Sequence, residues 1–208
     1  MKNVLIGLTG ALLLITVPVL AAPSVNGPTG LINIPSGDVL RPGQFTLGYY
    51  HLQDGGVGSY NTNVAPNLEF GVAVFSYDGQ KSKNYLNAKF AVVPETVLAP
   101  GLAIGVEDIS NKDRRGLYAV ASKALPFGLR IHVGTGSGRF NGVFAGIEKT
   151  LNPISVLTGN NAFPATTLIA EYDGQTMNYG ARMSIKPGLQ LDAGIRQHDG
   201  YIGISFTN

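Results

Sequence analysis

The sequence predicts an all-β protein, an antiparallel up-and-down transmembrane β-barrel of about 10–12 strands. Three observations favour this class: an N-terminal export signal, a series of short segments with alternating polarity, and no later apolar stretch long enough for a spanning helix. Without such a stretch, insertion into a membrane must use strands. We therefore expect a signal peptide at 1–21, an N-terminal segment at 22–43 and the barrel at 44–208.

The N-terminus has the order of parts found in a secretory signal. Lys2 supplies the positive charge, and an almost uninterrupted apolar run follows at 4–20. Small residues end the run, and we expect cleavage after Ala21. The alternative is a retained membrane anchor, but Pro18 and the shortness of the run argue against it. The sequence thus predicts an exported protein.

Composition narrows the class further. There is no cysteine, which excludes disulfides and a lipid-anchored N-terminal cysteine. The net charge is only +2 and is scattered, so a nucleic-acid partner is not expected. Twenty-eight glycines and only 13% charged residues are unusual for a soluble secreted domain. These values favour a protein with a large apolar surface.

The remainder of the chain divides into about eleven segments that alternate with period 2, separated by Gly, Pro, Asn and Asp. Short connections between them indicate an antiparallel meander, while 53–66 and 150–165 are interpreted as loops. Segment 29–34 is a candidate twelfth strand. The expected strands are 44–52, 67–76, 84–93, 101–109, 115–124, 128–137, 142–149, 166–173, 176–186, 188–196 and 199–206.

Each expected strand has an apolar face and a polar face. The apolar face carries no charge and includes Leu47, Ile104, Tyr118, Val120 and Ile204. The polar face mixes Gly and Ala with isolated charges of both signs. We expect its charged and titratable residues to form a luminal polar network of Glu69, Lys89, Glu107, Lys123, Arg130, His132, Glu148, Glu171, Arg182, Lys186, Asp192 and Arg196.

The balance of charges indicates which face is outside. A soluble sandwich would expose its polar face and carry Thr, Lys, Glu or Arg at most of those positions. The mixture of small residues with nearly balanced acids and bases is instead typical of a crowded lumen, where an unpaired charge is costly. Two roles for the luminal charges remain open: structural salt bridges, or a polar path for a glycan or small solute.

Several motifs carry a resemblance to a known family. They are G-P-T-G-L-I-N-I-P (27–35), N-A-K-F (87–90), G-L-A-I-G-V-E-D-I (101–109), V-A-S-K (120–123) and G-T-G-S-G-R-F-N-G-V-F-A-G-I-E (134–148). Together they cover most of the chain after the signal, and they resemble the YjbH family of outer-membrane barrels linked to exopolysaccharide production and export. Compared with that family the chain is short and lacks cysteine, so we interpret it as a short single-barrel member.

No enzyme or metal site is expected. None of the histidines, His51, His132 and His198, has a serine at a persuasive spacing for a hydrolase. Glu107 and Asp108 are adjacent, so in a strand they point to opposite faces and cannot chelate one ion. We therefore predict a protein without catalytic residues, metal or cofactor.

The leading hypothesis is a non-enzymatic outer-membrane barrel that serves exopolysaccharide export or envelope integrity. The resemblance implies outer-membrane lipid, and polysaccharide or export machinery, as partners. Three alternatives are a small diffusion porin, a lipid-modifying outer-membrane enzyme and a soluble β-sandwich adhesin. The T-G-L-I-N-I-P segment (29–35) precedes the barrel, and a first strand, a luminal plug and a periplasmic docking element all remain open for it.

Overall fold

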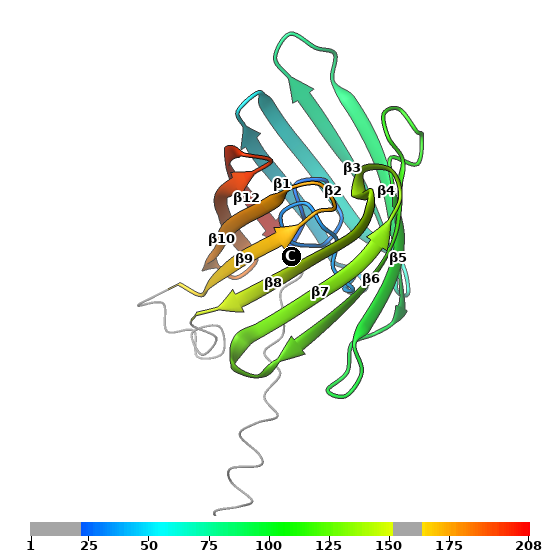
Figure 1. Cartoon of the computed structure of the whole chain (residues 1–208), viewed down its shortest axis with the longest axis vertical. Coiled ribbons are helices and arrows are strands. Elements are labelled where there is room, and N and C mark those ends of the chain that lie inside the picture. Colours follow the sequence, from blue (N-terminus) through cyan, green and yellow to red (C-terminus); the bar gives the residue numbers. More distant parts are fainter. Residues whose placement is uncertain (1–21, 152–163) are drawn as a thin grey trace, which may run out of the picture.

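The computed structural model describes residues 22–151 and 164–208, in which twelve strands form one closed antiparallel barrel (Figure 1). Each strand pairs with its sequence neighbours, and β1 pairs with β12 to close the barrel. The predicted up-and-down barrel is confirmed. The strands are β1 (Phe45–Leu52), β2 (Gly55–Ala65), β3 (Leu68–Tyr77), β4 (Lys83–Val93), β5 (Gly101–Glu107), β6 (Gly116–Leu125), β7 (Leu129–Gly136), β8 (Gly142–Thr150), β9 (Thr166–Tyr172), β10 (Met177–Lys186), β11 (Leu189–Arg196) and β12 (Asp199–Thr207).

Helix is nearly absent from the described residues. Two short 3₁₀ turns, η1 (Pro126–Gly128) and η2 (Gly138–Phe140), join β6 to β7 and β7 to β8. Neither is long and apolar enough to cross a membrane. The predicted signal peptide lies outside the described residues, so cleavage after Ala21 stays a prediction. The same holds for most of the expected loop at 150–165.

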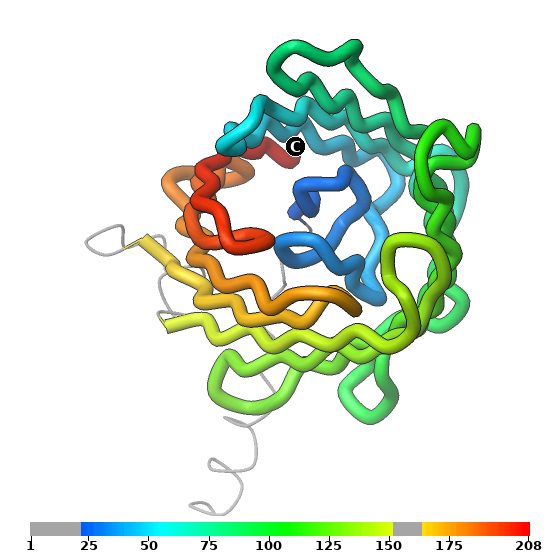
Figure 2. Tube along the Cα trace, turned by 45° about the horizontal axis from the view of Figure 1, so that its top comes forward, coloured from blue at the N-terminus to red at the C-terminus, as the bar shows by residue number. Residues whose placement is uncertain are grey.

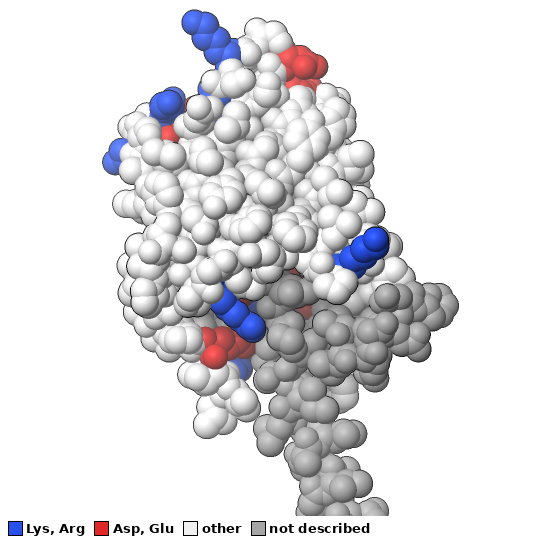
Figure 3. All heavy atoms as spheres, turned by 180° about the vertical axis from the view of Figure 1, so that it is seen from behind, with Lys and Arg blue, Asp and Glu red and all other residues white. Residues whose placement is uncertain are grey.

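The outer surface of the barrel is apolar. Outward side chains such as Ile104, Val133 and Ile202 are 51%, 53% and 61% exposed, although they are large aliphatic groups. Figure 3 shows a broad uncharged band across the visible face, with Lys, Arg, Asp and Glu above and below it. A belt of exposed aliphatic side chains between charged rims is the surface that a lipid bilayer covers.

One strand lies where the sequence predicted a loop. Within the expected loop 53–66, residues Gly55–Ala65 form β2, which pairs with both β1 and β3. Its sequence, G-G-V-G-S-Y-N-T-N-V-A, places glycine on the outer side and polar groups inside, so the usual contrast between the two faces is weak. The candidate strand 29–34 instead makes only isolated bridges, such as Gly30 with Pro35.

The two faces of β6 are the reverse of the prediction. Tyr118 and Val120 were expected to face lipid, but both are buried inside the barrel. Lys123 was expected in the lumen, but it lies directly opposite the outward-facing Ile131 of β7. Side chains directly opposite each other share a face of the sheet, so Lys123 points outward. The error arose because both faces of this strand are made of small and apolar residues.

The lumen is filled by the chain's own N-terminal segment (Figures 1 and 2). Residues 22–37 and Leu40 are buried, and 41–43 lead out to β1. We call residues 22–40 the plug. Its apolar side chains Val25, Leu31 and Ile34 join inward residues of the wall in one hydrophobic core. An eight-stranded barrel can be filled by its own side chains, but a twelve-stranded barrel is wider. The plug supplies the additional filling.

An arginine in the middle of the outer face should destabilise the barrel. Ile104 lies at the centre of β5 and faces outward, so Ile104→Arg should lower the free energy of unfolding in lipid vesicles by about 2–4 kcal/mol. Urea titration followed by heat-modifiable gel migration measures this. Gln80→Arg, on the exposed β3–β4 connection, is the control and should change little. Equal stability of the two variants would contradict a lipid-facing β5.

Candidate functional site in the plugged lumen

The motif T-G-L-I-N-I-P builds a compact loop at the centre of the plug. The backbone N–H of Leu31 donates to the carbonyl of Ile34 at 2.9 Å, and that of Val25 donates to Ile32 at 2.9 Å. Gly30 lies against the backbone of Ile34 and Pro35, where a β-carbon would be only 2.9 Å from the Pro35 Cα. The loop therefore directs consecutive N–H groups of its tip toward the barrel wall.

Glu171 of β9 receives these N–H groups. Its carboxylate accepts hydrogen bonds from the backbone of Ile32 at 3.0 Å, Asn33 at 2.7 Å and Ile34 at 3.3 Å. The Asn178 side chain of β10 donates to the same carboxylate at 3.0 Å. Converging backbone amides of this kind form an anion-binding concavity. Here the anion is a wall residue that is itself 1% exposed.

A second buried carboxylate holds the other side of the loop. Glu69 of β3 accepts from the Thr29 backbone at 2.8 Å, from its hydroxyl at 2.9 Å and from the Leu40 backbone at 3.2 Å. Lys89 of β4 donates to the Thr29 carbonyl at 2.6 Å and lies 3.9 Å from Glu69. Both charged groups are almost fully buried. The cost of burying each charge is offset by the opposite charge and by the hydrogen bonds to the plug backbone between them.

An ion pair ties the end of the plug to β7. The Arg130 guanidinium donates to both Asp38 oxygens at 2.5 and 2.8 Å and to Glu95 at 2.7 Å. Asp38 belongs to the plug and not to a strand. Burial raises the pKa of its carboxyl, but the hydrogen bonds and charge of Arg130 outweigh this effect and lower the pKa to about 2. The pair is therefore ionised at neutral and mildly acidic pH.

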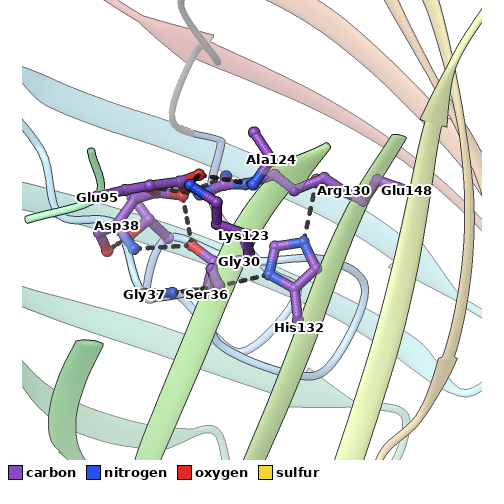
Figure 4. Close-up of polar contacts among 12 residues, drawn as sticks. Gly30, Ser36, Gly37, Asp38, Glu95, Lys123, Ala124, Arg130, His132 and Glu148 are labelled. Atoms are coloured by element: carbon purple, nitrogen blue, oxygen red, sulfur yellow. Dashed lines mark hydrogen bonds and ion pairs between the residues drawn. The ribbon is translucent and has the colours of Figure 1, made fainter. Parts of the chain in front are cut away.

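Next to this pair, a chain of hydrogen bonds runs from the plug through three wall residues (Figure 4). The Gly37 N–H donates to the Ser122 hydroxyl at 2.7 Å. Ser122 Oγ lies 2.7 Å from His132 Nδ1, and His132 Nε2 lies 3.3 Å from Glu148. The tautomer with its proton on Nε2 completes this chain, because Nδ1 then accepts from the Ser122 hydroxyl and Nε2 donates to Glu148. We call Ser122, His132 and Glu148 the β6–β8 relay.

At the tip of the plug loop, Asn33 binds side chains from three parts of the wall. Its amide donates to Asp173 at 2.7 Å, and its oxygen accepts from Arg196 at 2.6 Å. Arg139 of η2 donates to the Asn33 carbonyl at 2.7 Å and also pairs with Glu107. Burial raises the pKa of Asp173, in the β9–β10 turn, but hydrogen bonds from the Thr176 backbone and neighbouring amides outweigh this and lower it.

The remaining charged tie comes from β10. Arg182 donates to Asp192 of β11 at 2.7 Å and to plug carbonyls of Gly30, Leu31 and Pro23 at 3.2, 3.1 and 3.3 Å. The wall thus supplies carboxylates to plug N–H groups and cations to plug carbonyls. The geometry is that of a closed lumen, with the plug held through its backbone.

This geometry can be compared with known proteins. A family model described as "Exopolysaccharide biosynthesis protein YbjH" matches residues 24–163, more than half of the chain. The chain belongs to this family, YjbH. The match includes the plug from residue 24 onward and strands β1 to β8, which extends the resemblance seen in the motifs.

Two solved structures that resemble this YjbH family member are porins. A KdgM porin in complex with disordered oligogalacturonate has a TM-score of 0.53 and 10% sequence identity, covering 79% of this chain and 97% of that one. A second KdgM porin structure has a TM-score of 0.52 and 9% identity over the same shares. At such identity the likeness shows the fold, which is that of outer-membrane porin barrels. No curated protein matches the sequence significantly.

The structure brings most residues of the expected polar network into the lumen, but not all. Lys123 instead donates to the Thr96 and Val97 carbonyls outside the wall. Lys186 is exposed, because the register of β10 shifts between Ser184 and Lys186 and changes the alternation there. Inside the barrel lie Glu69, Lys89, Glu107, Arg130, His132, Glu148, Glu171, Arg182, Asp192 and Arg196.

Sequence reasoning missed two members of the site. Ser122 was assigned to the outer face of β6, so its contact with His132 went unseen. Arg139 lies in η2, within the expected connection 138–141, and it was left out because only charges on the polar faces of strands were assigned to the lumen. A serine, a histidine and an acid in contact is also the arrangement of a hydrolase nucleophile. Here Ser122 is 1% exposed, covered by Gly37 and directed away from lipid.

Metal binding has no support in the structure. No group of three or more His, Asp or Glu side chains in residues 22–151 and 164–208 is arranged to hold an ion. The carboxylates that could serve as ligands are instead occupied by plug N–H groups and by arginines.

Removing one charge should loosen the plug without unfolding the barrel. Glu171→Gln keeps the shape but replaces one accepting oxygen with an N–H₂ group facing backbone N–H donors. Because hydrogen bonds to a charged group contribute about 1.5–3 kcal/mol, deuterium exchange at residues 31–34 should accelerate about 10- to 100-fold. Asp113→Asn, at an exposed rim pair, is the matched control. Unchanged exchange at 31–34 would show that Glu171 does not hold the plug.

Proposed function

We propose that this YjbH family member is a non-enzymatic outer-membrane barrel acting in exopolysaccharide production or export, with the plug keeping its lumen closed between uses. The observation that carries this proposal is the plug itself, a buried segment fastened to the wall by ion pairs and charged hydrogen bonds. A barrel that only had to be stable could have fewer strands and fill its lumen with wall side chains, whereas a separate segment in a wider barrel can be moved.

The family description supports the link to exopolysaccharide. The apolar outer band between charged rims supports residence in a membrane. The β6–β8 relay supports a holding role, because it ends on a plug N–H group and not on an open surface. Together these features favour a protein whose work is done by the wall and the plug, without chemistry.

A diffusion porin is the second candidate, and the fold shared with KdgM porins favours it. A diffusion porin needs a water-filled lumen at rest. In this chain Leu31, Ile32 and Ile34 occupy the lumen and are at most 1% exposed. We therefore favour a barrel that is closed at rest over one that is permanently open.

Conductance in planar bilayers separates these two candidates. The full-length protein should show rare or no openings, because the plug fills the lumen. The double variant Glu69→Gln and Glu171→Gln should open at least tenfold more often, since both carboxylates bind plug N–H groups. Asp113→Asn should behave like the unmodified protein. A large steady conductance of the unmodified protein would favour the diffusion porin instead.

Exopolysaccharide release in the native host tests the biological role. Deleting the gene should reduce the released polymer several-fold, and supplying the full-length protein should restore it. The Ile104→Arg variant, impaired in membrane insertion, should restore less than Gln80→Arg does. Release that is unchanged after deletion would contradict the proposed role, even if the bilayer experiment shows a gated barrel.

A further inference from the structure

The charged ties to the plug are confined to one part of the wall. The residues that make them lie on β3 to β11, among them Glu69, Lys89, Arg130, Glu171 and Arg182. On β12, β1 and β2 the buried inward positions carry no charged side chain. The plug is therefore held by charged side chains on one side of the barrel and faces uncharged side chains on the other.

The uncharged side is a continuous polar surface. Thr46 of β1 lies opposite Thr207 of β12 and Asn61 of β2. Two residues farther along β1, Gly48 lies between Ser205 of β12 and Ser59 of β2. Ser205 also pairs with Gln190 of β11. We define the neutral wall as Thr46, Ser59, Asn61, Gln190, Ser205 and Thr207. All six are buried, at 7% exposure or less.

The plug meets this surface through neutral contacts. The Tyr50 hydroxyl donates to the Pro23 carbonyl at 2.8 Å, and the Asn61 amide donates to the Gly27 carbonyl at 2.6 Å. Pro23 also covers Gly48, where its Cγ would lie 3.4 Å from an added β-carbon. A proline ring over a glycine flanked by two serines leaves the serine hydroxyls without a protein partner.

Several buried polar atoms on this side lack a hydrogen bond in the described structure: Ser24 Oγ, Ser59 Oγ, Asn61 Oδ1, Gln190 Oε1, Tyr201 OH and Ser205 Oγ. Leaving a buried polar group unpaired costs about 1–3 kcal/mol. A wall built only to bind the plug would satisfy these groups or replace them by apolar residues. Of the nine such atoms in the described residues, only Tyr118 OH, Arg130 Nε and Asp192 Oδ2 lie outside this group. The concentration of the other six points to a different partner that reaches them when the plug moves.

From this placement we propose that the neutral wall is a binding surface for an uncharged glycan, which enters between the plug and strands β11, β12, β1 and β2. Hydroxyl and amide groups offer both donors and acceptors to sugar hydroxyls, and the Tyr50 ring beside them offers an apolar face. On this side the plug loses mainly neutral hydrogen bonds when it yields, together with the 3.3 Å contact of Arg182 with the Pro23 carbonyl. Its other charged ties keep it in the barrel.

The absence of charged side chains on these strands favours a neutral sugar over an anionic one. A carboxylated sugar placed against Thr46, Ser59 and Ser205 would bury its negative charge without a cation on these strands. A neutral sugar carries no such penalty. The inference rests on the proposed role in exopolysaccharide handling and adds the class of sugar and its path along the wall.

Binding of two matched oligosaccharides to the full-length protein in detergent tests the proposal. The probes are maltohexaose, which is neutral, and a galacturonate hexamer, which is anionic. Calorimetry should show binding of maltohexaose and at least tenfold weaker binding of the anionic probe. The Ser59→Ala and Ser205→Ala double variant should weaken maltohexaose binding about threefold to tenfold, through the loss of sugar hydrogen bonds. Ser76→Ala, on the exposed side of β3, is the matched control.

The outcomes separate this inference from the proposed function. Stronger binding of the galacturonate, or equal binding by the double variant and the control, would overturn the neutral wall. Either result leaves the effect of gene deletion on polymer release untouched. Binding that strengthens in the Glu69→Gln and Glu171→Gln variant, with the preference for maltohexaose kept, would support entry beside a loosened plug. No binding in any variant would also overturn the neutral wall.

Discussion

Charges buried inside a wide barrel need partners, and in this protein the plug backbone supplies them. Glu69 and Glu171 accept from plug N–H groups, while Lys89 and Arg182 donate to plug carbonyls. The barrel also needs apolar volume in its lumen, which the plug side chains provide. A segment with apolar side chains and exposed backbone groups meets both needs at once. This explains why a sequence as apolar as T-G-L-I-N-I-P lies among so many charged wall residues.

The barrel could be predicted because its constraint repeats along every strand. Lipid outside and a polar lumen inside impose period 2, and one misjudged strand does not alter the class. The exceptions were local. In β2 glycines take outward positions and polar groups face inward, so the alternation is faint, and at Lys186 a shift in register breaks it. The sequence left three roles open for the segment that forms the plug, because its partners in the wall lie up to 163 residues away in the sequence.

The inversion of β6 shows how one facing error hides a site. The prediction placed Tyr118 toward lipid, and the alternation along β6 then placed Ser122 on the same face. In that arrangement Ser122 could not be recognised as a partner of His132. Reversing the strand places Tyr118 against Phe140 and brings Ser122 to the histidine. Both contacts are local, within the β6–β7 hairpin and the η2 turn that follows it, so they depend on which face of β6 points inward. The facing of this one strand is therefore the part of the site that required the structure.

The relay and the ion pairs also bear on which side of the plug yields. The Asp38–Arg130 pair, the hydrogen bonds of Glu69 and Lys89 to Thr29, and the β6–β8 relay all join the plug to strands β3 to β8. Separating buried opposite charges costs far more than breaking neutral hydrogen bonds, because each charge is left in a poorly solvating interior. Movement of the plug is therefore easiest away from β12, β1 and β2. The neutral wall carries most of the unpaired hydroxyl and amide atoms. The side of the lumen that opens most easily therefore also offers hydrogen-bonding groups to a ligand.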